Sequence, residues 1–304
     1  MKRKLLLYIL LIGILAGGVT LMAVRWNAWF VEPVEPCDDV VECRVNTLTE
    51  DTLSIKKILV LGDVQDRDMV TAVETQERIN EIVNRERPEL ILQTGDLFER
   101  QTQASWNRVA VAFNDVMDSV PMVVALGNHD YHKGVVHKPD KRMYEAFGYF
   151  GTKDIDKPAV AHFVLSPDTL DLFILDSNRG IISLFRQSGW LNDVLQGSTA
   201  KFKVVALHHP MRSEVSWWNN LFVRLAFESM VKRHGVQLVL CGHEHYYNHK
   251  QLGYHQIIAH FSKKDYGSAG VAGRHYVTVE IKGNDLMVKA FDDCGRKVGE
   301  FSIK

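Results

Sequence analysis

Acidic, amide and imidazole side chains recur in short motifs, each placed directly after a run of apolar residues. In chain order, the motifs are Gly62-Asp63-Val64-Gln65, Gly95-Asp96, Gly127-Asn128-His129-Asp130, His208-His209-Pro210 and Gly242-His243-Glu244-His245. This mixture of oxygen and imidazole ligands suits Mn, Fe or Zn, and the number of groups exceeds what one ion needs. A central carboxylate can bridge two ions about 3.5–4 Å apart, a spacing suited to in-line displacement at phosphorus. The sequence therefore favours a site for two metal ions.

No single motif is sufficient for that interpretation. A Gly-Asp pair after a strand is most often a turn, and a lone His-x-His is most often a pair of surface residues. Their joint occurrence, each at the end of an apolar run, is the informative signal. A glycine before Asp63, Asp96 and Asn128 also lets the backbone turn sharply and approach the ions closely.

The elements that position these motifs follow from the apolar pattern. Strands are predicted at 58–61, 90–92, 122–126, 163–165, 172–175, 204–207, 236–240, 255–260, 276–281 and 286–291. Helices are predicted at 68–86, 104–118, about 218–234 and around 190–195. Alternating strands and helices favour parallel pairing, and ligands bind beyond the carboxyl ends of parallel strands. We therefore expect an α/β fold of two facing sheets with helices outside, and one rim that collects the motifs.

The ordered motif set resembles the signature of the calcineurin-like metallophosphoesterases over about residues 56–300. The resemblance implies an αββα sandwich and a phosphoesterase that hydrolyses phosphate mono- or diesters with a metal-bound hydroxide as nucleophile. Among the branches of that superfamily, the motifs lean toward the purple acid phosphatases. Glu99, however, stands where their metal-ligating tyrosine would fall. A ferric-tyrosinate centre is therefore not expected, and the cofactors are two divalent or trivalent ions, Mn, Fe or Zn.

The same resemblance implies a role for each motif residue. The first metal would be surrounded by Asp63, Gln65, Asp96 and His245, and the second by Asp96, Asn128, His208 and His243, with Asp96 bridging. His129 would stabilise charge on the phosphate or protonate the leaving oxygen. Glu99 would orient His129, and Asp130 is a second candidate for that supporting part. His208 is expected to be the ligand rather than His209, because the histidine of the family usually lies two residues before the proline.

Gln65 departs from the family pattern, since many members have histidine at that position. An amide oxygen can bind a metal, but it is neutral and a poorer donor. Gln65 could instead bind the substrate phosphate. It is also the only support for a second hypothesis, a membrane-tethered binding protein on a degenerate metallophosphoesterase scaffold. Every other ligand position is intact, which favours the enzyme.

The N-terminal residues differ from the rest of the chain. The cations Lys2, Arg3 and Lys4 precede an unbroken apolar run at residues 5–24. As a helix, that run would span about 30 Å of hydrocarbon. We expect a membrane anchor at 1–26, a linker at 27–54 and the metallophosphoesterase domain at 55–304. The catalytic domain is expected on the extracytoplasmic (periplasmic or extracellular) side of the membrane. A cleaved signal peptide is the alternative.

Charge and cysteine content limit the remaining possibilities. The net charge is -1, with 36 basic and 37 acidic residues, so extended binding of nucleic acid is not expected. Cys37 and Cys43 are close enough in sequence to form a disulfide in an oxidising compartment. No CxxC pair is present, which argues against a cysteine zinc site. The expected partners are a small or lipid-linked phosphate ester and, through the N-terminal helix, a membrane.

Overall fold

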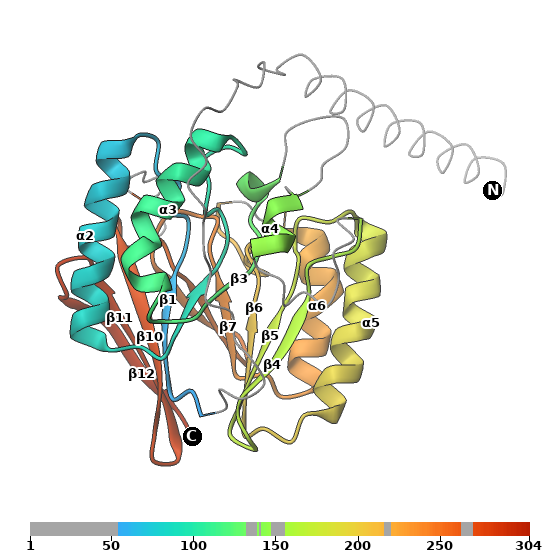
Figure 1. The fold of residues 1–304 in the computed structure, drawn as a ribbon. Helices are drawn as coiled ribbons and strands as arrows, with labels where there is room; N and C mark the ends of the chain where they lie inside the picture. The colour runs from blue at the N-terminus through green and yellow to red at the C-terminus, as the bar shows by residue number, and fades with distance from the viewer. Residues whose placement is uncertain (1–53, 132–138, 140, 147–155, 216–219, 263–269) are drawn as a thin grey trace, which may run out of the picture.

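The strands form two six-stranded sheets that face each other, with helices on the outer faces (Figure 1). The computed structural model describes residues 54–131, 139, 141–146, 156–215, 220–262 and 270–304. Strand order is β12-β11-β10-β1-β2-β3 in the first sheet and β4-β5-β6-β7-β9-β8 in the second. This arrangement confirms the predicted mixed α/β fold of two sheets flanked by helices.

The first sheet combines a parallel part with an antiparallel part. The parallel strands are β1 (Lys57–Leu61), β2 (Leu90–Gln93) and β3 (Met122–Val124), connected by α2 (Met69–Glu86) and α3 (Gln103–Met117). The antiparallel strands are β10 (His275–Lys282), β11 (Asp285–Asp292) and β12 (Lys297–Ile303), which extend the sheet from β1. After β3 come the short helix η1 (Asn128–Asp130) and α4 (Lys141–Ala146).

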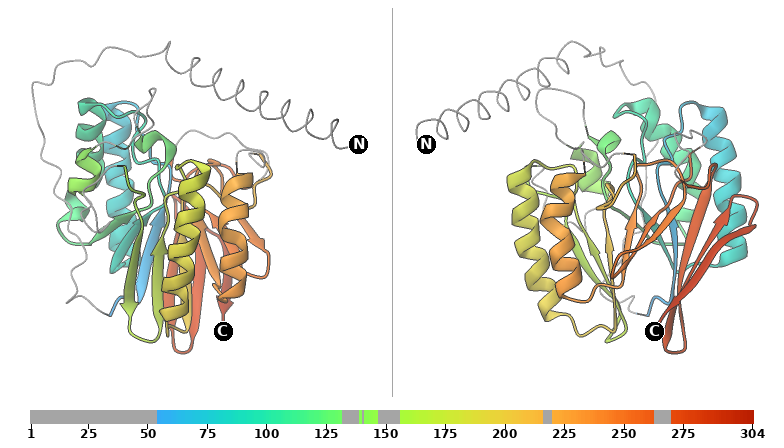
Figure 2. Two further views of the ribbon diagram at one scale, coloured as in Figure 1. Left: turned by 90° about the vertical axis from the view of Figure 1, so that its right-hand side faces the viewer. Right: turned by 180° about the vertical axis from the view of Figure 1, so that it is seen from behind.

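The second sheet is built mainly from parallel strands. Its members are β4 (Ala161–Ser166), β5 (Leu170–Ile174), β6 (Phe202–Ala206), β7 (Leu238–Cys241), β8 (Asn248–Gln251) and β9 (His255–Ile258). Parallel pairing joins β5, β6, β7 and β9, while β4 and β8 are antiparallel edge strands. Two neighbouring helices, α5 (Ile181–Gly197) and α6 (Leu221–Arg233), cover its outer face (Figure 2).

The central strands bury both of their faces, as the alternation along β1 illustrates. Ile58 and Val60 pack into the core between the sheets, whereas Leu59 and Leu61 pack into the layer beneath the helices. All four side chains are completely buried. Burial on both faces explains why the central strands read as continuous apolar runs in the sequence. The polar motifs therefore fall where burial ends, at the carboxyl ends of the strands.

The predicted membrane anchor, nearly all of the predicted linker, Cys37 and Cys43 lie in residues 1–53, outside the described residues. Among the helices that the structure describes, none is both long and apolar enough to cross a bilayer. Two cysteines in the described part of the chain are free thiols: Cys241, which is buried, and Cys294, which is exposed.

A cluster of charged side chains ties the chain after β6 to α6. Glu228 is only 8% exposed and accepts from Arg212 Nε at 2.9 Å and from Arg224 Nε at 3.0 Å. The Lys232 ammonium lies 3.2 Å from the same carboxylate. Burial opposes ionisation, but hydrogen bonds from these three cations outweigh it and lower the pKa of Glu228 below its ordinary 4.5. The segment that carries His208 is thereby anchored to α6.

Replacing Glu228 by glutamine is expected to lower the free energy of unfolding at pH 7 by about 1–2 kcal/mol, because three cations lose a shared anion. Since the folded-state pKa lies below the unfolded one, this stabilisation is present above about pH 4.5 and is lost at lower pH. Urea unfolding of both proteins between pH 3 and pH 7 measures the difference. Glu214→Gln, at an exposed carboxylate, is the matched control. A difference that did not shrink on acidification would contradict the charge-based account.

Candidate metal centre

The ligand loops leave their strands in a backbone conformation that side chains usually avoid. Seven described non-glycine residues have positive φ, and five of them are predicted metal ligands: Asp63, Gln65, Asp96, His243 and His245. Each such residue costs on the order of 1 kcal/mol or more and persists only where its surroundings enforce it. Strain concentrated at one end of the strands marks a site that the fold holds in a particular shape.

Two glycines allow the loops to close around the carboxylates. A Cβ atom on Gly127 would lie 2.1 Å from Asp96 N and 2.2 Å from Asp96 Oδ1. A Cβ on Gly242 would lie 2.6 Å from Asp63 Oδ2. Real Cβ contacts are never this short, so only glycine fits at these positions. The glycines that mark the motifs in the sequence are therefore required by close packing around Asp63 and Asp96.

The first ligand group lies just beyond the carboxyl ends of β1, β2 and β7 and is almost completely buried. Asp63, Asp96 and His245 offer ligand atoms that all lie within 4.8 Å of one another, and each residue is 3% exposed or less. Gln65 joins them, because its Nε2 donates to Asp96 Oδ2 at 2.8 Å. Gln65 Oε1 is buried and has no hydrogen-bond partner within the described residues. An unsatisfied buried oxygen beside two carboxylates fits the position of a metal ligand.

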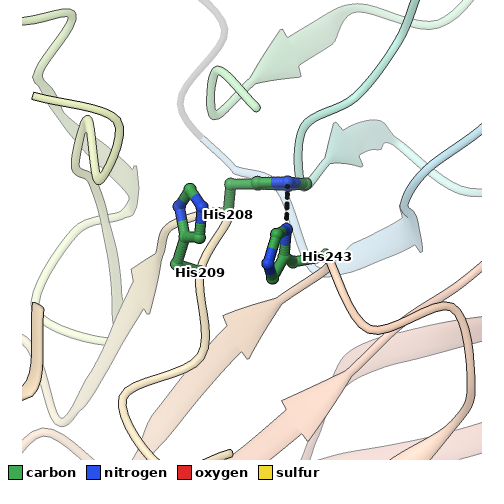
Figure 3. A group of neighbouring side chains, drawn as sticks. All are labelled: His208, His209 and His243. Carbon is green, nitrogen blue, oxygen red and sulfur yellow. Dashed lines mark hydrogen bonds between the residues drawn. The ribbon is translucent and has the colours of Figure 1, made fainter. Parts of the chain in front are cut away.

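The second group gathers around Asn128. Asn128 Oδ1 lies 3.1 Å from His208 Nε2 and 3.1 Å from His243 Nδ1. The two imidazole nitrogens are 3.3 Å apart, and Figure 3 shows the rings turned toward each other. Asp96 Oδ2 lies 3.4 Å from His208 Nε2, so Asp96 belongs to both groups. The two adjoining clusters therefore share one carboxylate.

His208 and His209 point to different partners. His208 is fully buried, and its Nδ1 donates to the Thr94 carbonyl oxygen at 3.0 Å, which directs Nε2 at the cluster. The His209 ring lies beside His243, but its Nδ1 is 2.9 Å from Ser177 Oγ. His209 can therefore reach the rim of the centre, whereas His208 lies inside it (Figure 3).

Charges in the centre are strongly coupled. Burial lowers the pKa of His208, but the adjacent Asp96 carboxylate outweighs that effect and raises it to about 9. Burial alone would raise the pKa of Asp96, yet His208 holds it well below its usual range. Burial, opposed by His208, raises the pKa of Asp63. Burial and the His208 charge lower the pKa of His243 to about 3, which favours the neutral imidazole that binds metals.

His129 lies at the edge of the centre and is oriented by backbone groups. Its N–H donates to Asp96 Oδ1 at 2.7 Å, and its ring Nδ1 lies 2.7 Å from the Glu99 carbonyl oxygen. The Glu99 carboxylate instead lies 3.8 Å from Arg67 Nε. The expected carboxylate–histidine pair is thus replaced by a carbonyl–histidine contact. Any residue at position 99 could provide that contact through its backbone carbonyl. The acidic side chain of Glu99 therefore did not indicate which of its groups contacts His129.

Asp130 performs a different task from the one expected. Its carboxylate is fully buried and accepts four backbone N–H groups. The donors are Gly127 at 2.7 Å, Leu97 at 2.9 Å, Asp96 at 3.0 Å and Phe98 at 3.3 Å. No hydrogen bond to His129 is made. Asp130 is a positioning residue that holds the Asp96 loop against the loop after β3.

Sequence reasoning missed two contributions to the site. His260, which follows β9, stacks on His245 with ring centroids 4.9 Å apart and is fully buried. Asp176 and Ser177 follow β5, and Asp176 accepts from Tyr131 Oη at 2.5 Å. The strand-end rule that found the other loops applies equally to Asp176-Ser177. His260 belongs to no recognised motif, but it also stands at the end of a predicted strand.

Comparison with known proteins agrees with this geometry. Residues 56–247, more than half of the chain, match the family model described as calcineurin-like phosphoesterase. A dimetal phosphatase from Danio rerio is similar in fold (TM-score 0.62, 16% identity, 83% of this chain and 99% of that one). GAP50, the anchor in the inner membrane complex of Plasmodium, is also similar in fold (TM-score 0.61, 15% identity, 83% of this chain and 89% of that one). No curated protein sequence matches the chain.

The two-sheet fold and the buried carboxylate, amide and imidazole groups at its rim define a metal-dependent hydrolase of phosphoric ester bonds. The chain belongs to the calcineurin-like phosphoesterase family.

Proposed function

We propose that the site hydrolyses phosphate mono- or diesters with two bound metal ions. Asp63, Gln65, Asp96 and His245 would hold one ion, and Asp96, Asn128, His208 and His243 the other. The observation that supports this most strongly is the position of Asp96, whose Oδ2 contacts both Gln65 Nε2 and His208 Nε2. The donor set fits Mn, Fe or Zn, and Gln65 Oε1 is a buried oxygen that otherwise has no partner among the described residues.

Bound ions of this kind lower the pKa of water and neutralise charge on the phosphate oxygens. The residues of the chain supply the geometry. The Thr94 carbonyl fixes the His208 tautomer, and the Asp63 carboxylate accepts the His243 N–H at 2.9 Å, which holds that loop in place. His129 would act on the substrate. Its Nδ1 is engaged by the Glu99 carbonyl, which leaves Nε2 as the ring atom able to meet the phosphate or the leaving oxygen.

The family membership concerns residues 56–247, and the roles of the flanking segments are part of the proposal. Residues 55–304 would form the metallophosphoesterase domain, which a linker at 27–54 connects to a membrane anchor at 1–26. Three cations before the apolar run support an orientation with the catalytic domain on the extracytoplasmic side.

Hydrolysis of a chromogenic phosphomonoester and of the matching diester tests the proposal. The full chain in detergent is stripped of metal and resupplied with Mn, Fe or Zn separately. We expect turnover at least about 10³-fold above the metal-free protein, because both water activation and charge neutralisation depend on the ions. Metal analysis should give a content near two ions per chain. The preferred ester separates a phosphatase from a phosphodiesterase.

One outcome would favour the other hypothesis. Tight binding of metal without turnover of either ester would indicate a membrane-tethered binding protein. The Gln65 amide N–H that faces Asp96 would then mark a first site that never fills.

A further inference from the structure

Large apolar side chains are exposed at the same end of the molecule as the metal centre. Among the described residues, eleven large hydrophobic side chains are exposed, and eight of them lie in the first two turns of α2, α5 and α6. Helices α2 and α6 follow strands β1 and β6, whose carboxyl ends deliver metal ligands, and α5 follows the neighbouring parallel strand β5. In contrast, the opposite end contributes Val164, in β4. Exposed apolar residues concentrated on one face usually mark an interaction surface.

One patch lies on the second sheet's helices. Ile181, Ile182 and Phe185 of α5 line an open pocket together with Arg186. On the adjacent helix α6, Phe222 is 47% exposed and Leu225 is 55% exposed. We call these apolar side chains the α5–α6 patch.

A second patch lies on the other flank of the metal centre. Met69, Val70 and Val73 are exposed at the start of α2, and Val70 is 69% exposed. We call these side chains the α2 patch. Figures 1 and 2 show α2 and α5 on opposite sides of the molecule, with the strand ends between them. A partner that covers both patches must be broad and nearly flat.

Both patches carry arginines. Arg67 directly precedes the α2 patch and its side chain is 59% exposed. Arg186 lies in the pocket of the α5–α6 patch. Exposed apolar side chains interspersed with arginine suit the headgroup region of a bilayer. There the apolar groups enter the acyl boundary, and the guanidinium groups remain among phosphates.

The predicted N-terminal anchor, outside the described residues, would hold the domain close to a bilayer. Residues 5–24 form an apolar run long enough to span it. The 29 residues from 25 to 53 could extend to about 100 Å, and a domain of this size is about 45 Å across. The tether therefore permits either end of the domain to face the membrane, and the two patches select the end with the metal centre. We propose that the α2 and α5–α6 patches dock on the lipid surface, with the metal centre between them facing the bilayer.

The consequence for substrate rests on the proposed function. A phosphoesterase held in this orientation would act on phosphate esters presented at the bilayer surface, such as lipid-linked phosphates. Soluble esters would reach the same centre only from the side.

Fluorescence quenching by brominated lipids tests the docking independently of activity. The full chain carries Cys37→Ser, Cys43→Ser and Cys294→Ser, and is reconstituted in vesicles. An environment-sensitive probe is attached at Val70→Cys, Ile182→Cys or the matched control Val164→Cys. Docked residues lie about 5–10 Å into the headgroup and acyl boundary, so quenching at 70 and 182 should exceed that at 164 by about threefold.

Equal quenching at the three positions, or quenching at only one patch, would overturn the proposal. So would protection of both probes in lipid-free detergent that increased with protein concentration, because a second copy of the chain would then cover the patches. All of these contrary results can be obtained without measuring turnover.

A charge variant tests the substrate class. Ile182→Glu combined with Phe185→Glu should lower turnover of a phosphate ester embedded in vesicles about tenfold, since apolar contact area is lost. Turnover of a soluble chromogenic ester should not fall, because undocking does not hinder its access, and the control Val164→Glu should leave turnover of both esters unchanged. Equal turnover of the embedded ester by variant and parent would overturn surface presentation. Failure of the parent on both esters would instead reject the proposed function, while the quenching result stands.

Discussion

Asp96→Asn is expected to lower kcat/KM for phosphate ester hydrolysis by at least about 10³-fold, the largest effect of any single substitution in the centre. Asp96 contacts side chains of both ligand groups, through Gln65 Nε2 at 2.8 Å and His208 Nε2 at 3.4 Å. Asparagine preserves the shape but removes the negative charge and replaces one oxygen by a donor. Neither ion would then be held by a full set of ligands, so the metal content should fall below two.

Kinetics with the preferred ester and metal analysis of the same samples measure both effects. Asp171→Asn is the matched control, because Asp171 is also a buried aspartate but contacts His162 and Ser198 outside the metal centre. The variant should also lower the pKa of His208, because the Asp96 charge that raises it is gone. If Asp96→Asn retained two ions and lost less than tenfold in rate, a shared bridging carboxylate would be ruled out.

The central strands and the ligand loops could be predicted from the sequence because burial and chemistry coincide there. Strands buried on both faces, such as β1, have no polar interruption, and the first polar residue after each marks the loop. The predictions at 58–61 and 90–92 differ from β1 and β2 by a residue at one end. The prediction at 122–126 extends beyond β3, although Ala125 N–H still donates to the Gln93 carbonyl oxygen of β2 at 2.8 Å, and Leu126 is buried in the loop.

Two edge strands, β8 and β12, escaped prediction for the complementary reason, whereas the edge strands β3 and β4 contain apolar runs and were predicted. The residues of β8, Asn-His-Lys-Gln, are all polar, and the strand forms one edge of the second sheet. Similarly, β12 forms an edge of the first sheet, with charged residues on its exposed side and a central glycine. Edge strands are commonly polar because an apolar edge invites pairing with other chains. The position of these two strands is set by backbone hydrogen bonds to the neighbouring strand. The local sequence pattern carries no information about that pairing.

The role of each site residue was harder to predict from the sequence than which residues belong to the site. The residue types at 99 and 130 suggested acids that act on His129, although only Asp130 adjoins it in sequence. The structure assigns the contact to the Glu99 backbone and uses the Asp130 carboxylate to collect amides. Such roles depend on which atoms face one another across two loops. His260 shows the same limit, since its stacking on His245 arises only when β9 lies beside β7.

Asp130→Ala is expected to lower the free energy of unfolding by about 3–5 kcal/mol, the largest stability effect predicted for the chain. Removal of the carboxylate leaves the buried N–H groups of Gly127, Asp96, Leu97 and Phe98 without an acceptor. Each unsatisfied buried donor is costly, and water has little access to a residue that is completely buried. For a domain of this size, the loss corresponds to a Tm lowered by about 10 °C.

Asp130→Asn separates this positioning role from a catalytic one. Its remaining oxygen can still accept from part of the amide set, so its Tm should fall between those of the parent and the alanine variant. Metal affinity should fall in the same order, by about 10- to 100-fold for alanine, because the Asp96 loop is no longer held against Gly127. Thermal unfolding of the metal-free proteins and metal titration measure the two quantities. A variant with unchanged Tm and metal affinity but reduced kcat would show that Asp130 acts on the substrate instead. A parallel fall in both quantities would establish that four backbone amides, gathered on one carboxylate, set the geometry on which the bridging role of Asp96 depends.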